Sequence, residues 1–167
     1  MLVALISDTH MASAAGRPSK RRLPERCSEL IARSDLLVHA GDFVTEEVLD
    51  ELAALGPPVE AVYGNQDSAA LRQRLPGERL IELPGVTLGV IHDAGPSRGR
   101  LERLRARFPD AGAVVFGHSH LPLHESRDGF QIFNPGSPTE RRRAPRHSMG
   151  MARVEWGTIA FEHAWLS

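Results

Sequence analysis

Short apolar runs alternate with helix-like stretches through the first two-thirds of the chain, and this alternation restricts the fold more than any other feature. The apolar runs lie at residues 2–6, 36–38, 59–63, 86–91 and 113–116. Runs without polar alternation are typical of strands that are covered on both faces. The pattern therefore predicts an α/β fold whose strands pair largely in parallel.

Four stretches between these runs have the apolar spacing of amphipathic helices. They cover residues 24–33, 45–55, 68–75 and 100–108. Pro24 suits a first helical turn, and Thr45 is predicted as a helix N-cap. Residues 13–22 are predicted as a polar loop.

After residue 120 the pattern changes to paired strands around tight turns. Residues 121–125 and 130–133 flank Asp128-Gly129, a favoured hairpin turn. Residues 151–156 and 158–165 flank Gly157 in the same way. We expect this tail to be antiparallel and to close a second sheet.

Composition restricts the class of protein. A chain of 167 residues with 41% apolar residues is expected to form one domain over residues 1–167. Its net charge of −1 disfavours nucleic acid and anionic membranes as partners. Its apolar runs are too short to span a bilayer. The lone Cys27 cannot form an intrachain disulfide, so we expect a cytoplasmic protein.

Each of the five predicted parallel strands ends at residues that can bind a metal. These residues are Asp8, His10, Asp42, Asn65, His92, His118 and His120. The carboxyl ends of strands are where open α/β sheets bind ligands. If strand geometry persists, the pairs Asp8/His10 and His118/His120 each point to one face. The sequence thus predicts one metal site built from all seven side chains.

Seven ligands are too many for one tetrahedral zinc ion and suit two ions that share a carboxylate. Two divalent ions with two aspartates leave the site positive, so it attracts a phosphate. Such a pair can generate a hydroxide and clamp a phosphoryl group. The nitrogen and oxygen ligands favour Mn, Fe, Co, Ni or Zn over Ca. We expect two divalent ions and take manganese as the first candidate.

The ordered set of these residues, with Asn134-Pro135-Gly136-Ser137 near the end, resembles the calcineurin-like metallophosphoesterase superfamily. The length most resembles its small, capless bacterial and archaeal phosphodiesterases. The resemblance implies a four-layer α/β/β/α sandwich of two mixed β-sheets flanked by helices. One metal would then be held by Asp8, His10, Asp42 and His120. The bridging and second-metal residues, which we expect to be catalytic, would be Asp42, Asn65, His92 and His118.

Two positions depart from the family pattern. Larger members carry a histidine that assists the leaving group where this chain has Gln66, and an amide has no proton to give. Small members often have glycine where this chain has Asp93. That carboxylate is expected either to support a ligand or to repel an anionic substrate.

Other histidines and arginines match no motif. His39 is expected to face away from Asp42 and to be structural or supporting. Structural roles are also expected for His124, His147 and His163, and Cys27 is predicted as a core thiol. The clusters Lys20-Arg21-Arg22 and Arg141-Arg142-Arg143 with Arg146 are interpreted as solvated loops, with a phosphate-attracting rim as the alternative.

The sequence therefore predicts a metal-dependent phosphodiesterase that acts on small diesters through a metal-bridging hydroxide. The alternative from another class is a catalytically weak metal-binding scaffold, like the retromer subunit of this fold. A nuclease is disfavoured by the net charge. The resemblance allows a homodimer or a homotetramer.

Overall fold

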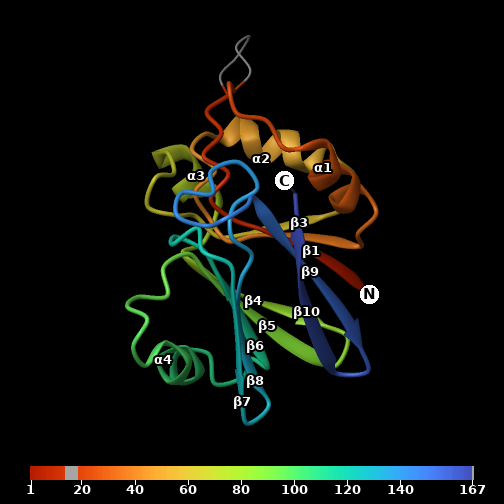
Figure 1. Ribbon diagram of the computed structural model, residues 1–167, viewed down its shortest axis with the longest axis vertical. Coiled ribbons are helices and arrows are strands. Elements are labelled where there is room, and N and C mark those ends of the chain that lie inside the picture. The colour runs from red at the N-terminus through yellow and green to blue at the C-terminus, as the bar shows by residue number, and fades with distance from the viewer. Residues whose placement is uncertain (14–18, 167) are drawn as a thin grey trace.

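The computed structural model describes residues 1–13 and 19–166. Residues 14–18, in the loop predicted at 13–22, and residue 167 lie outside the described part. Two five-stranded sheets pack face to face, and helices cover their outer surfaces (Figure 1). This is the four-layer α/β/β/α sandwich that the family resemblance implied.

The first sheet joins three parallel strands from the start of the chain to a hairpin from its end. Its strands, in spatial order, are β10 (Thr158–Trp165), β9 (Ser148–Glu155), β1 (Leu2–Ile6), β2 (Leu36–His39) and β3 (Val59–Ala61). The central strands β1 and β2 are almost entirely buried, which explains their unbroken apolar sequences.

The second sheet has a parallel centre, because β5, β6 and β8 run in one direction. Its strands, in spatial order, are β4 (Glu78–Leu83), β5 (Val86–Ile91), β6 (Ala113–Phe116), β8 (Phe130–Asn134) and β7 (Leu123–Arg127). The edge strands β4 and β7 are antiparallel to their neighbours.

Three apolar clusters hold the layers together. One lies between the sheets and contains Leu5, Val90 and Phe133. The second lies between the first sheet and its helices, and the third lies beneath the remaining helix. The helices are α1 (Glu25–Ala32), α2 (Glu46–Ala53) and α3 (Ala69–Arg74) on the first sheet, and α4 (Arg100–Arg107) on the second (Figure 1).

The structure corrects the predicted strands at two places. Strand β4 was not predicted, although it forms a hairpin with β5. The two hairpins of the tail do not close one second sheet together: β7 and β8 join the second sheet, whereas β9 and β10 join the first. The pairing of β9 with β1, in which Leu5 lies opposite Gly150, spans most of the chain and leaves no local signal.

No helix in the described part of the chain is long and apolar enough to cross a bilayer. This agrees with the short apolar runs in the sequence. Cys27 is buried in α1 as a free thiol, as predicted.

Candidate metal centre

The seven predicted ligands occupy loops that follow five strands. Asp8 and His10 follow β1, Asp42 follows β2, and Asn65 follows β3. His92 follows β5 directly, and the segment of His118 and His120 follows β6. Because β1, β2 and β3 are parallel, as are β5 and β6, these loops emerge at the carboxyl ends of both sheets.

Five of these residues have a left-handed backbone conformation that L-amino acids rarely adopt. They are Asp8 (φ 55°), His10 (φ 43°), Asp42 (φ 63°), His118 (φ 68°) and His120 (φ 59°). The expected continuation of strand geometry through the two His-containing pairs is therefore wrong. Each such conformation costs on the order of 1 kcal/mol or more, and this kind of strain gathers at functional sites.

One group of side chains forms around Asp8. His120 Nε2 lies 3.4 Å from Asp8 Oδ1, and His10 Nε2 lies 3.9 Å from the same oxygen. The two imidazole Nε2 atoms are 3.2 Å apart, and their rings stack. One ligand atom from each residue falls within 4.8 Å of the others, a spacing that a single ion could bridge.

A second group shares Asp8 and adds Asp42 and His92. Asp42 Oδ2 lies 3.3 Å from His92 Nε2 and 3.5 Å from His10 Nε2, so this carboxylate stands between the two groups. Asn65 Oδ1 is 3.1 Å from His92 Nε2 and 3.1 Å from His118 Nδ1. The structure thus brings all seven predicted residues together, and the ring of His118 contacts Asn65 whereas that of His120 contacts Asp8 and His10.

Backbone carbonyls fix the tautomers of two of these histidines. His92 Nδ1 donates to Ala40 O at 2.7 Å, and His120 Nδ1 donates to the carbonyl of Glu140. In the neutral rings, both Nε2 atoms therefore carry lone pairs that point into the cluster. His92 Nε2 faces two oxygen acceptors there, which is favourable only if a proton or a cation lies between them.

The electrostatics of the two aspartates agree with a cation site. Asp8 Oδ2 is buried and has no hydrogen-bond partner among the described residues. Burial raises the pKa of Asp8 to about 7. Burial alone would also raise the pKa of Asp42, but hydrogen bonding and charge from His92 outweigh it and hold this pKa at about 2. An orphaned carboxylate oxygen beside converging imidazole lone pairs fits a divalent metal.

Asp67 is a supporting residue that the sequence analysis missed. Its carboxylate accepts backbone N–H groups from Asp42 at 3.0 Å, Val44 at 2.8 Å and Gly64 at 2.7 Å. It therefore joins the loops after β2 and β3. Its place two residues after Asn65 was the available signal.

The Asn134–Ser137 motif joins the other loops. Asn134 Nδ2 donates to Gly117 O at 2.9 Å, which holds the loop after β6. Ser137 Oγ donates to Asp8 O at 2.8 Å. The motif thus lies behind the cluster and fixes the backbone on both sides of it.

The remaining histidines lie outside the cluster. His39 is buried, accepts from Gly41 N at 3.1 Å and contacts Thr9 Oγ1 at 3.1 Å, so it supports the loops from beneath. His124 contacts Gln131 on the second sheet, and His163 contacts the carbonyl of Asn134. Neither of these two, nor His147, joins a group of potential ligands within the described residues.

The two departures from the family pattern have clear positions. The side chain of Gln66 is exposed, and its backbone N–H donates to Asp42 Oδ1 at 2.8 Å. Asp93 Oδ1 accepts from Gly95 N at 2.8 Å in its own loop. Asp93 therefore hydrogen-bonds within its own loop and not to a predicted ligand.

A charged rim borders the Asp8 side of the cluster. Glu140 Oε2 lies 3.8 Å from His10 Nε2 and 3.3 Å from Arg21 Nη1, which also donates to His10 O. Burial is the main reason that the pKa of His120 is lowered to about 4, and the nearby charge of Arg142 lowers it further. Arg21 and Arg142 are therefore close enough to influence an anion in the cluster.

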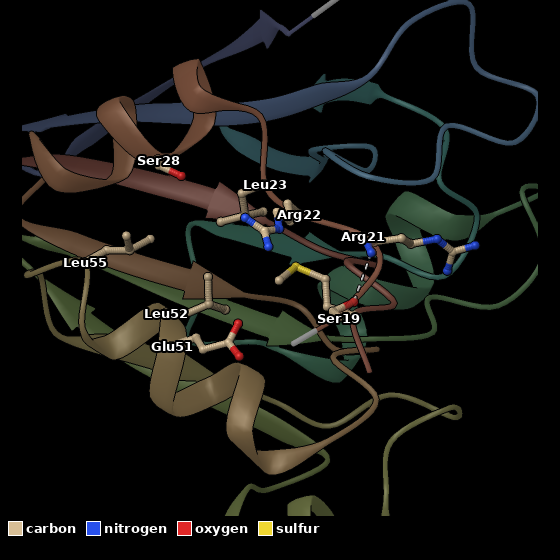
Figure 2. Close-up of a pocket in the computed structure, with 9 residues that line it drawn as sticks. Ser19, Arg21, Arg22, Leu23, Ser28, Glu51, Leu52 and Leu55 are labelled. Carbon is tan, nitrogen blue, oxygen red and sulfur yellow. Dashed lines mark hydrogen bonds between the residues drawn. The ribbon is translucent and has the colours of Figure 1, made fainter. Parts of the chain in front are cut away.

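A cavity of about 360 Å³ lies beyond this rim, between α1 and α2. Figure 2 shows Ser28 on α1 facing Glu51 and Leu52 on α2 across it, with Arg21 at its edge. None of its lining residues is among the seven predicted ligands. A second cavity, of about 410 Å³, is lined in part by Asn65 and His92.

Comparison with known proteins identifies the class to which this arrangement belongs. Residues 1–157 match the family model described as the calcineurin-like phosphoesterase superfamily domain. The chain belongs to this family of metal-binding phosphoester hydrolases.

Similar proteins are named as metallophosphoesterases or phosphodiesterases. A probable metallophosphoesterase of Methanothermobacter thermautotrophicus is 35% identical over 144 residues, which cover 85% of this chain and 80% of the relative. A phosphodiesterase of Methanocaldococcus jannaschii is 26% identical over 148 residues, covering 81% of this chain and 83% of the relative. Among solved structures, zinc-complexed Vps29 of Entamoeba histolytica has a TM-score of 0.76 at 21% identity, with both chains fully covered. At that identity the likeness shows the fold alone.

Proposed function

We propose that this chain is a phosphodiesterase that holds two divalent metal ions in the seven-residue cluster, with manganese as the first candidate. The observation that carries the proposal is the buried, unpartnered Asp8 Oδ2 beside imidazole lone pairs that converge on the same space. The family membership and the name of the Methanocaldococcus relative support the reaction class.

The distances suggest how the ligands divide. Asp8 lies within reach of His10 and His120 and also of Asp42 and His92, while Asn65 contacts His92 and His118. We assign Asp8, His10 and His120 to one ion and Asn65, His92 and His118 to the other, as the family resemblance implies. Asp42 Oδ2 is within 3.5 Å of a histidine from each group, as expected of a bridging carboxylate.

Two ions bound here would supply a bridging hydroxide near neutral pH and positive charge for the phosphate oxygens. The chain's own residues prepare the site for the phosphate. The carbonyls of Ala40 and Glu140 orient His92 and His120, and Asp67 orients the loop of Asp42. His118 is exposed and His92 is buried beside it, and we propose that these two histidines position phosphate oxygens.

A diester is the preferred substrate because it carries one negative charge and needs no additional cation. Two aspartates and two divalent ions leave a charge of about +2 at the site. The rim adds Arg21 and Arg142 but also Glu140, so its contribution is partly cancelled. We further propose that residues 1–167 act as one domain in the cytoplasm, as a homodimer or homotetramer.

Hydrolysis of bis(4-nitrophenyl) phosphate with added manganese, together with calorimetric titration of the metal, tests this proposal. Asp42→Asn should lower kcat by at least about 100-fold and weaken metal binding, because the amide cannot bridge as an anion. The matched control is Asp128→Asn, which makes the same change at another left-handed aspartate (φ 49°) in a distant hairpin. It should keep wild-type activity.

The scaffold alternative predicts a different result. It has the fold likeness to Vps29 in its favour, but the seven residues predicted as ligands lie in one cluster in this chain, which favours the enzyme. If wild-type protein and Asp42→Asn hydrolyse the diester equally, or neither does so, the scaffold is the better description.

A further inference from the structure

The cavity of about 410 Å³ shares lining residues with the metal cluster, and the side chains that line it indicate which kind of ligand it can bind. Asn65 and His92 belong both to its lining and to the predicted second metal group. When these residues hold a phosphate, one of its ester groups can therefore extend into the cavity without crossing protein atoms. Its volume falls in the range of small-molecule sites, roughly 300–1,000 Å³.

An aromatic side chain and a fixed guanidinium form one wall. The guanidinium carbon of Arg72 lies over the Tyr63 ring, 5.1 Å from its centre. Arg72 Nε donates to Asp67 O at 3.1 Å, and Nη2 donates to Asn65 O at 2.9 Å. Tyr63 is held by its backbone bond to Pro76 O, and Gly77 packs close to its hydroxyl. Both groups are therefore preorganised.

The rest of the lining is polar but electrically balanced. Arg107 Nε and Glu78 Oε2 form an ion pair at 2.6 Å. Together with Arg72 and Asp93, the lining has two positive and two negative side chains, and Ile91 adds an apolar surface. A lining of zero net charge favours an uncharged group, and the flat Tyr63–Arg72 wall favours a ring.

We propose that this cavity binds the ester substituent that stays on the phosphorus when the other leaves, and that this substituent is an uncharged aromatic ring with hydrogen-bonding groups, such as a nucleobase or an aryl group. The inference rests on the proposed phosphodiesterase function for the reaction, but the cavity can be tested without turnover. Tyr63 and Arg72 act as specificity-determining residues, because they contact the substituent and not the phosphorus.

Tyr63 is the only tyrosine in the sequence, which provides a direct probe. Protein labelled with 3-fluorotyrosine should give one fluorine resonance from the cavity wall. With zinc, a diamagnetic ion, titration with thymidine 5′-monophosphate or phenyl phosphate should shift this resonance in a saturable way. Methyl phosphate should not. An unmoved resonance with both aromatic phosphates, or an equal shift with methyl phosphate, overturns the inference. A shift with phenyl phosphate alone restricts the ring to simple aryl groups.

Kinetics give the second test. Thymidine 5′-(4-nitrophenyl phosphate) and methyl 4-nitrophenyl phosphate share one leaving group and differ in the other ester. The ratio of their kcat/KM values should be about 10 in the wild type and should approach 1 in Tyr63→Leu. Trp156→Leu, which removes a fully exposed aromatic ring elsewhere, should keep the wild-type ratio.

The two tests separate the inference from the function on which it rests. Absence of hydrolysis for every ester contradicts the phosphodiesterase proposal, while the fluorine resonance still decides whether the cavity binds aromatic phosphates. Hydrolysis with a wild-type ratio near 1 contradicts the cavity assignment and leaves the phosphodiesterase proposal intact.

Discussion

The carboxylate of Asp67 accepts the backbone N–H of Asp42 at 3.0 Å, so a buried aspartate fixes the residue proposed to bridge the two metals. The same carboxylate accepts two further N–H groups, from Val44 and Gly64. Burial raises the pKa of Asp67, although these hydrogen bonds oppose the rise. Three donors around one carboxylate make this contact sensitive to substitution.

Asp67→Asn should therefore weaken both the fold and the metal site. The new amide presents its own N–H group to backbone donors, which leaves buried groups unpaired. We expect a loss of about 2–3 kcal/mol in the free energy of unfolding, measured with urea. Manganese affinity, measured by calorimetry, should fall by at least about tenfold.

Asp35→Asn is the matched control, because Asp35 Oδ2 also accepts a backbone N–H, from Leu2 at 2.6 Å, but at an exposed position away from the cluster. It should bind manganese with wild-type affinity. If Asp67→Asn also does so, the carboxylate does not position Asp42.

Gln66 should make the rate strongly dependent on the leaving group. Its exposed side chain has no proton to donate, so aryl diesters should react well and alkyl diesters poorly. Gln66→His should reduce the dependence of log kcat on leaving-group pKa, whereas Gln66→Asn should keep it. The backbone N–H that donates to Asp42 is the same in all three proteins. A wild-type rate that does not vary across an aryl and alkyl series would contradict this prediction.

The sequence predicted the cluster because each ligand segment follows an apolar run. Strand β4 was missed because Leu80, 49% exposed at a sheet edge, breaks the alternation set by Ile81 and Leu83. The Pro84-Gly85 turn was a usable signal, since Gly85 has a φ of 76° between two strands. The sheet assignment of β9 depends on contact with β1, and no short-range pattern encodes it.

The backbone of the site could not be predicted in the same way. Aspartate tolerates the left-handed region, but histidine at φ 59° to 68° is held there by its surroundings. For His118 those surroundings include the bond from its own N–H to Asp8 Oδ1 at 3.2 Å. For His120 they include the Glu140 carbonyl, 20 residues further along the chain. Such contacts appear only after the loops have assembled.

Arg142 should favour substrates with higher negative charge. Its charge is felt at both His10 and His120, where it adds to burial in lowering the histidine pKa values. Arg142→Gln should lower kcat/KM for the dianion 4-nitrophenyl phosphate by about two- to fivefold, and by less for an aryl diester. High salt should remove the difference. Arg143→Gln is the control, and equal effects of the two substitutions would mean that the rim acts only through net charge.

His163 should make the metal-free protein less stable in mild acid. Burial lowers its pKa, although its bond to the Asn134 carbonyl opposes this, and its ring stacks on Phe133. The unfolded chain then binds a proton more readily than the folded one, so stability is lost as the pH falls through about 6.5.

His163→Phe keeps a ring in this stack but cannot titrate. Urea unfolding between about pH 7.5 and about pH 5 should show a shallower pH dependence for this variant. Trp165→Phe keeps a ring next to His163 and leaves that histidine free to titrate, so it should keep the wild-type dependence. If the stability of His163→Phe and of the wild type depends on pH in the same way, His163 has the same pKa in the folded and the unfolded chain.

Gly64→Ala should disable the metal centre while the sheets remain folded. A Cβ at this position would lie 2.8 Å from Asp42 Cγ and 2.5 Å from Asp42 N, so the loops after β2 and β3 must separate. The apolar clusters do not include Gly64 and should persist, as far-UV circular dichroism can verify. Manganese binding by calorimetry should weaken by at least about tenfold.

Gly99→Ala is the control for backbone strain alone, because Gly99 has a φ of 66° before α4 and an added Cβ would meet no atom within 4 Å. It should lose about 1 kcal/mol of stability and bind manganese normally. Wild-type manganese affinity in Gly64→Ala would mean that Asp42 does not depend on this close approach.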